Sequence, residues 1–216
     1  YRLKDAYRLP DNLITVEESP RFVLSGEISS IYKKNGKVRK VHNVILMPGL
    51  EQAEQLRGIL QKMNYAALKR LWKCNDQIAA LNIERLRQMD LRRNLTPAVL
   101  AYEGIQYQYM APNVFTNQEY DYIQEHLRIL SGFYGILRPF DGVTPYRLEM
   151  QAKLKIHEAK DLYNYWNNQL ADHIFAGTDC VINLASKEYS ICVSKYLHPG
   201  IRFITCVFGE EKDGKI

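Results

Sequence analysis

The sequence lacks any run of 18 consecutive apolar residues, the minimum expected of a helix that crosses a membrane. Its first residues, Tyr1 to Pro10, mix charged and aromatic side chains and contain no apolar segment of the kind found in secretory signals. We therefore expect a cytoplasmic protein with no membrane partner.

Cysteine is also scarce, and its four copies are dispersed without a CxxC pair. A zinc site would need clustered ligands, and the five histidines are as scattered as the cysteines. Three of the cysteines stand among apolar neighbours, which favours reduced thiols in a core over a metal site or a disulfide framework. The four residues are Cys74, Cys180, Cys192 and Cys206.

The motifs of several enzyme classes are absent: GxGxxG, GxxxxGK[ST], GxSxG, HExxH and HxH. Nucleotide-binding, acyl-transfer and metalloprotease functions therefore lack their starting residues. Asp141 and Glu149 could form a carboxylate pair, but without a partner histidine or a pocket such residues more often lie in solvated turns. We expect no cofactor, and the residues do not argue for an enzyme.

The composition fits a folded domain. Of the 216 residues, 46% are hydrophobic and 25% are charged, which is too apolar for a disordered polymer. The formal net charge is +5, and it is unevenly distributed. Residues 1–49 hold nine Lys and Arg against five Asp and Glu, whereas residues 50–216 hold twenty against nineteen. The larger part of the chain is therefore almost neutral, and net charge alone does not identify its partner.

The hydrophobic pattern changes near the same position. Before Pro48, short β-rich runs at 21–24 and 41–47 and the Asn35-Gly36 turn predict strands. From Leu50 onward, apolar residues at spacings of three and four predict helices, the first of which ends before Asn64. The expected fold is mixed α/β, with helices around a mixed sheet and a short β-rich segment in front.

Several later elements have boundary signals. Asn75 or Asp76 caps one helix, and Thr96-Pro97 opens another. The capping box Thr116 to Glu119 starts a helix that Gly132 ends. Other patterns predict a strand over 105–109, one helix over 161–175, a buried strand over 180–184, a helix from 186 and a strand over 201–208 that lacks a partner strand after the final turn.

The densest chemistry lies between His126 and Lys155. A glycine-containing turn after a helix would let backbone amides approach a phosphate, and neighbouring basic side chains would neutralise it. The alternative is that the glycines only end one helix and admit the next helix, while the arginines pair with Asp141 and Glu149. The candidate nucleic-acid-binding residues are Arg128, Gly132, Gly135, Arg138, Arg147 and Lys153.

Four segments resemble the YaaA family of bacterial peroxide stress proteins. They read LTPAVLAYEGIQYQYM (95–110), DYIQEHLRILSGFYGILRPFDGVTPYRLEMQAKL (121–154), KDLYNYW (160–166) and VINLASKEY (181–189). The resemblance covers the chain from Leu50 to its C-terminus. It implies a single-domain cytoplasmic α/β protein that binds DNA and limits iron-dependent DNA damage during hydrogen peroxide stress.

The resemblance also implies a basic cleft and a helix-hairpin-helix-like element for DNA. In this sequence that element would match the segment from Leu127 to Leu137, although Gly132 and Gly135 are three positions apart rather than two. The family's first strand and its C-terminal strand have no counterpart, so we expect a family member truncated at both ends.

Residues 12–51 instead resemble part of an endonuclease Q-type PHP domain, a metal-dependent phosphoesterase fold. Glu27 and His42 would stand at metal-ligand positions there, but two ligands are too few for a di- or trimetal site. The alternative is that both are ordinary polar residues. We expect a chimera of a PHP-like fragment (1–49) and a YaaA-like domain (50–216), joined near Leu50 to Leu56.

Three functions are therefore open. The first is a YaaA-like DNA-binding stress protein, which we favour for the body of the chain. The second is a remnant of a metal-dependent DNA endonuclease. The third is a non-functional fragment whose incomplete sheet exposes strand edges and promotes aggregation.

Overall fold

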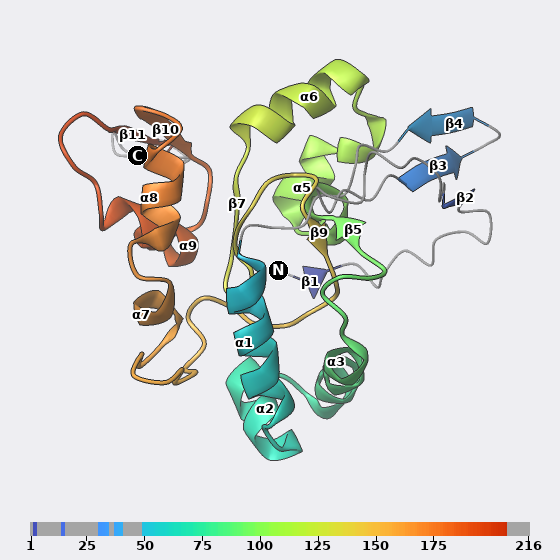
Figure 1. The fold of residues 1–216 in the computed structure, drawn as a ribbon, viewed down its shortest axis with the longest axis vertical. Helices are drawn as coiled ribbons and strands as arrows, with labels where there is room; N and C mark the ends of the chain where they lie inside the picture. Colours follow the sequence, from blue (N-terminus) through green and yellow to red (C-terminus); the bar gives the residue numbers. More distant parts are fainter. Residues whose placement is uncertain (1, 4–13, 16–29, 35–36, 41–48, 207–216) are drawn as a thin grey trace, which may run out of the picture. The chain divides into compact units, whose positions relative to one another are not determined.

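The computed structural model describes residues 2–3, 14–15, 30–34, 37–40 and 49–206. The chain divides into two compact units, Tyr1–Ala152 and Lys153–Ile216 (Figure 1). Helices and small sheets make up both units, which confirms the mixed α/β class. The division falls within the segment that was expected to form one domain. Among the described residues, no helix is both long and apolar enough to cross a membrane.

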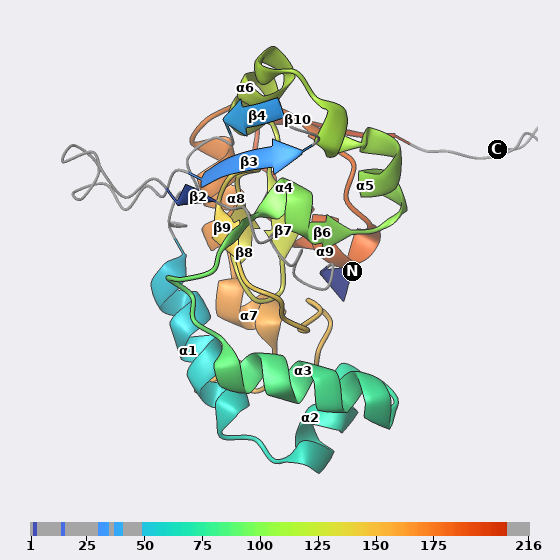
Figure 2. The same ribbon diagram turned by 90° about the vertical axis from the view of Figure 1, so that its right-hand side faces the viewer.

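Three consecutive helices follow Gly49 in the first unit. The third packs against the other two, as Figure 2 shows. The side chain of Asn64 caps the second by accepting from Ala67 N, and Asn75 caps the third by accepting from Ile78 N, each at 2.9 Å. The structure thus confirms the prediction that the first helix ends before Asn64 and the prediction that Asn75 caps the third helix. The bounds are α1 Leu50–Gln61, α2 Tyr65–Trp72 and α3 Asp76–Gln88.

The next segment departs from its predictions. The predicted short helix is present, but it starts at Ala98 with Pro97 as its N-cap residue, because Thr96 and Pro97 pair as a strand. The predicted strand over 105–109 is wrong, because these residues form a helix. Ile105 and Tyr109 are both exposed, so their alternation with glutamine does not mark a buried strand face. The bounds are β5 Thr96–Pro97, α4 Ala98–Ala101, β6 Tyr102–Glu103, α5 Ile105–Met110 and the 3-10 helix η1 Pro112–Val114.

Helix α6 (Asn117–His126) begins at the predicted capping box. Glu119 N donates to Thr116 Oγ1 at 3.3 Å, and Thr116 N donates to the Glu119 carboxylate at 2.6 Å. The helix ends at His126 rather than at Gly132, because the backbone becomes extended at Leu127. The segment after it is a β-hairpin of β7 (Ile129–Ser131) and β8 (Gly135–Leu137), not a second helix.

The core of the first unit gathers around this hairpin. Phe133 and Tyr134 in its turn are fully buried. A chain of hydroxyl groups crosses the core: Ser131 Oγ lies 2.7 Å from the Tyr146 phenol, which lies 2.8 Å from that of Tyr102. The Tyr134 phenol accepts from Thr144 N at 2.9 Å. Strand β9 (Gly142–Val143) follows the hairpin and pairs antiparallel with β5.

The described strands form several separate sheets rather than the one mixed sheet that was expected. Near the N-terminus, β1 (Arg2–Leu3) pairs with β6, and β2 (Ile14–Thr15), β3 (Ser30–Lys34) and β4 (Lys37–Lys40) form an antiparallel sheet. The register Lys34↔Lys37 agrees with the predicted hairpin. Asn35, Gly36 and the strands predicted at 21–24 and 41–47 lie outside the described residues.

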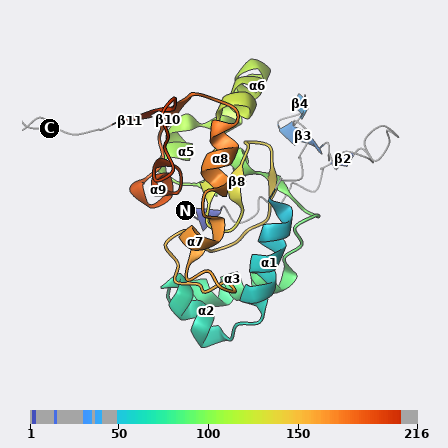
Figure 3. The same ribbon diagram turned by 60° about the vertical axis from the view of Figure 1, so that its left-hand side comes forward.

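The second unit contains the orange and red elements of Figure 3. The predicted single helix over 161–175 is two helices, because Asn167 adopts a positive φ of 46° and breaks the helical path. The two predicted strands are present and pair in parallel, but Ile182 and Ile204 are exposed, so the first is not the buried strand expected. The bounds are α7 Leu162–Trp166, α8 Gln169–Phe175, β10 Cys180–Asn183, α9 Lys187–Ser194 and β11 Arg202–Thr205.

All four cysteines are free thiols, but they do not share one environment. Cys192 is buried, where desolvation raises its pKa to about 12. Cys206 is exposed, and Cys74 and Cys180 are intermediate. The prediction of core thiols therefore holds fully for Cys192 only. Among the described residues, no group of three or more His, Cys, Asp or Glu side chains could hold a metal ion.

Candidate nucleic-acid interface

Arg128 and Arg138 flank the β7–β8 hairpin at its open end. The strand register pairs Ile129 with Leu137, so continuing it by one residue places Arg128 opposite Arg138. Their charges interact, since the pKa of the Arg128 guanidinium is lowered by burial and, second, by the nearby charge of Arg138. The fold thus holds two like charges together at one place.

The carboxylate of Asp141 offsets the repulsion between Arg128 and Arg138. Its side chain is buried and accepts three hydrogen bonds from Arg138: from N at 2.8 Å, Nε at 3.2 Å and Nη2 at 3.1 Å. Burial raises the pKa of Asp141, and its bonds with Arg138 and the charge of Arg128 act against that rise. One carboxylate beside two guanidinium groups leaves the cluster positive, with the Arg138 side chain 32% exposed.

Arg128 has a second role at the end of α6. Its Nη1 donates to the carbonyl oxygens of Gln124, Glu125 and Leu127 at 3.3, 2.8 and 2.8 Å. Carbonyls at a helix C-terminus have no partner within the helix, and a cation is favourable there. This contact explains why α6 stops at His126, since the guanidinium occupies carbonyls that the amides of another turn would need.

The two glycines serve the packing of the hairpin. A Cβ on Gly132 would lie 2.7 Å from the carbonyl oxygen of Leu148, so only glycine fits. Gly135 has a φ of 75°, which glycine adopts without strain. The turn amides of Phe133 and Tyr134 donate to Ser131 Oγ at 3.1 and 2.9 Å. These amides are thus already bonded and buried within the protein.

The other two candidate residues lie elsewhere. The Arg147 side chain is 18% exposed, and its Nη2 donates to Trp72 O at 3.2 Å and lies 3.5 Å from Glu149. It ties its segment to the end of α2. Lys153 is exposed and belongs to the second unit. Glu27 and His42, the weak metal-ligand candidates, lie outside the described residues.

The arginines therefore do pair with Asp141 and Glu149, as the alternative interpretation stated. The pairing with Asp141 leaves net positive charge on the Arg128–Arg138 pair, because a single buried carboxylate lies beside both guanidinium groups. The sequence analysis named this pairing but placed Asp141 in a solvated turn, so it missed that the carboxylate is buried. The available signal was its position three residues after Arg138, the separation at which the carboxylate reaches back to the amide of that arginine.

Comparison with known proteins identifies the chain. The profile of the family described as "Peroxide stress protein YaaA" matches residues 32–216. The match therefore begins before the junction that was expected near Leu50. A UPF0246 protein of Lachnoclostridium phytofermentans is 53% identical over 167 residues, which are 77% of this chain and 66% of that protein. One of Agathobacter rectalis is 57% identical over 164 residues, 76% of this chain and 66% of that protein.

The chain thus spans just under two thirds of the length of these relatives. The matched part nevertheless includes the hairpin, the Arg128–Arg138 pair and Asp141. The resemblance of the N-terminal segment to an endonuclease stays a prediction. The extent of the match and the level of identity show that the chain belongs to the YaaA family of peroxide stress proteins.

Proposed function

We propose that the protein is a cytoplasmic DNA-binding member of the peroxide stress response that limits iron-dependent oxidative damage to DNA. The observation that carries the DNA contact is the Arg128–Arg138 pair beside Asp141. Holding two guanidinium groups together costs electrostatic energy, and a phosphate that lies between them would relieve it. Arginine suits this role because its planar donors can bond two phosphate oxygens at once.

The proposed contact is to the phosphate backbone and not to bases. The rigid support of both arginines, by α6 carbonyls and by Asp141, fixes where their remaining donors are presented. Backbone contacts position a protein on DNA without sequence preference, which suits a protein that protects DNA in general. Arg147 is a weaker candidate because most of its side chain is covered.

Neutralising Arg128 should weaken duplex binding and flatten its salt dependence. In Arg128→Gln, the amide can still donate to the α6 carbonyls, so the fold is retained while the charge is lost. We expect Kd for a labelled duplex to rise roughly tenfold at low salt. The slope of log K against log salt should fall by about 0.9, the contribution of one phosphate contact. Fluorescence polarisation at several salt concentrations measures both quantities.

Arg93→Gln is the matched control. It removes the same charge from a side chain that is 83% exposed and distant in sequence from the hairpin. We expect it to leave Kd and the slope nearly unchanged. An unchanged slope in Arg128→Gln, with binding intact, would remove this residue from the interface. Absence of binding by the wild-type chain at low salt would contradict the proposed function itself.

A further inference from the structure

Charge is segregated along the first unit in a way that the DNA proposal does not use. Residues 50–93, which span α1 to α3, contain nine Lys and Arg and five Asp and Glu. Residues 94–127, which span α4 to α6, contain no Lys or Arg and four Asp and Glu. Two adjacent stretches of one chain therefore carry charges of +4 and −4, so their surfaces are complementary.

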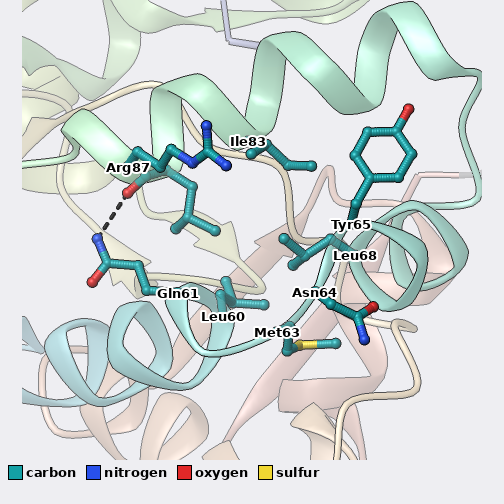
Figure 4. A pocket seen from close by; sticks show the side chains of 9 residues that line it. Leu60, Gln61, Met63, Asn64, Tyr65, Leu68, Ile83 and Arg87 are labelled. Carbon is teal, nitrogen blue, oxygen red and sulfur yellow. Dashed lines mark hydrogen bonds between the residues drawn. The ribbon is translucent and has the colours of Figure 1, made fainter.

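The basic stretch contains a pocket. It is half open, with a volume of about 350 Å³, and lies between the end of α1, the start of α2 and the end of α3 (Figure 4). Arg87 lies at one end and Tyr65 at the other, and no carboxylate lines it. The Arg87 side chain is 74% exposed, and its Nη1 lies 3.8 Å from the exposed carboxylate of Glu84, a surface pair that contributes little and leaves the guanidinium accessible. The size of the pocket suits one aromatic side chain or a small organic group. The apolar lining is Leu60, Met63, Leu68, Ile83 and Leu86.

The acidic stretch presents the complementary feature. Helices α5 and α6 contain no buried residue, although both carry tyrosines. Tyr122 on α6 is 65% exposed, follows Asp121 directly and precedes Glu125 by three positions. The ring of His126 lies 4.5 Å from that of Tyr122, which supports it from one side. An exposed aromatic ring between carboxylates fits an apolar pocket with a cation at its rim.

Tyr109 on α5 is also exposed, but it lacks this charge pattern. No Asp or Glu lies within four positions of it in either direction. Charge complementarity with the Arg87 rim therefore selects Tyr122 over Tyr109 as the residue that enters the pocket.

From these features we propose that two copies of this chain associate head to tail. Tyr122 of one copy occupies the pocket between α1, α2 and α3 of the next, and Glu125 of the first copy faces Arg87 of the second. The two surfaces are different patches, so the contact is heterologous and can repeat from copy to copy. It is driven by burial of one aromatic anchor and steered by opposite charge, so high salt weakens it.

Sedimentation velocity of the full chain over a range of concentrations tests this contact. The weight-average sedimentation coefficient of the wild type should rise with protein concentration and fall with added salt. Tyr122→Ser should raise the dissociation constant about thirtyfold, the effect of losing a hot-spot aromatic. Tyr109→Ser is the matched control and should behave as wild type. A wild type that stays monomeric at low salt, or an equal loss in both variants, overturns the proposal.

Mixing variants distinguishes a heterologous contact from a symmetric one. Ile83→Trp fills the pocket and leaves Tyr122 intact, whereas Tyr122→Ser leaves the pocket intact. Neither variant should associate alone, but the mixture should form dimers and stop there, because each pair has one working tyrosine and one working pocket. A mixture that stays monomeric overturns the proposal.

A charge-reversal pair tests the same contact without filling the pocket or removing Tyr122. Glu125 and Arg87 have side chains that are 78% and 74% exposed, so Glu125→Lys and Arg87→Glu should both fold. Each single variant should associate more weakly than wild type, because contacts between its copies set like charges against each other. An equimolar mixture of the two single variants should regain association, since every contact between unlike copies joins opposite charges. The double variant should regain association, because each contact again joins opposite charges. Failure of the double variant to recover overturns the assigned pairing.

Discussion

Gly132→Ala is expected to lower the free energy of unfolding by about 3 kcal/mol. A Cβ at this position would lie 2.7 Å from Leu148 O and 2.9 Å from both Glu149 C and Met150 N. All three are backbone atoms, so no side-chain rotation can remove the overlap. The hairpin turn must separate from the 148–150 segment, which opens the packing around Phe133 and Tyr134.

Urea or thermal unfolding followed by circular dichroism measures this loss. For a chain of this length, about 3 kcal/mol corresponds to a fall in Tm of roughly 6–12 °C. Gly58→Ala is the matched control, because Gly58 lies inside α1 with no atom within 4 Å of the added methyl group. That change should be neutral or stabilise the helix by about 0.5–1 kcal/mol. If both variants unfolded like wild type, the close approach at Gly132 would be wrong.

Asp141→Ala is expected to cost about 3 kcal/mol. It leaves the amide of Arg138 without its acceptor and removes the only carboxylate bonded to the Arg128–Arg138 pair among the residues described. The Arg138 side chain is partly exposed, so water can solvate it and the cost stays near the lower end for a broken buried pair. Asp141→Asn should cost less, since its oxygen can still accept from the amide.

Asp90→Ala provides the comparison for Asp141. Asp90 also accepts from a backbone amide, that of Arg92 at 2.8 Å, and lies 3.9 Å from Arg93, but its side chain is 48% exposed. Exposed pairs contribute little, so we expect a loss within about 1 kcal/mol. Equal losses in Asp90→Ala and Asp141→Ala, measured by urea unfolding, would show that burial of the carboxylate does not matter.

Local signals predicted the parts of the fold that local interactions determine. The Asn75 cap and the Thr116–Glu119 capping box each satisfy helix amides with side chains three positions away, and both are present. The Lys34↔Lys37 register likewise agrees with a hairpin predicted from residues that are neighbours in the sequence. These elements need no information from distant parts of the chain.

The failures have tertiary causes. The apolar residues Leu127 and Leu130 continue a helical spacing, but the contact of Arg128 with the α6 carbonyls and the pairing of β7 with β8 override it. Alternation in 105–109 was too short to distinguish a strand from a helix with exposed ends. In both cases the sequence pattern was real, and packing or hydrogen bonding beyond the window decided the structure.

The candidate site was predicted in part. Composition drew attention to the segment that contains Arg128 and Arg138, and the hairpin register then places the two opposite each other. Spacing could not reveal that Asp141 is buried, nor that Arg147 would bond to Trp72, 75 positions earlier in the chain. Such long-range partners leave no periodic signal.

The hydroxyl chain through the hairpin core sets an alkaline limit for the fold. Burial raises the pKa of the Tyr146 phenol to about 12, and that of Tyr102 lies well above its usual value. In the unfolded chain both phenols would ionise near pH 10. Below that pH both states keep the protons and the phenols do not alter stability. Above it the unfolded chain alone releases them, so each phenol lowers the free energy of unfolding by about 1.4 kcal/mol per pH unit.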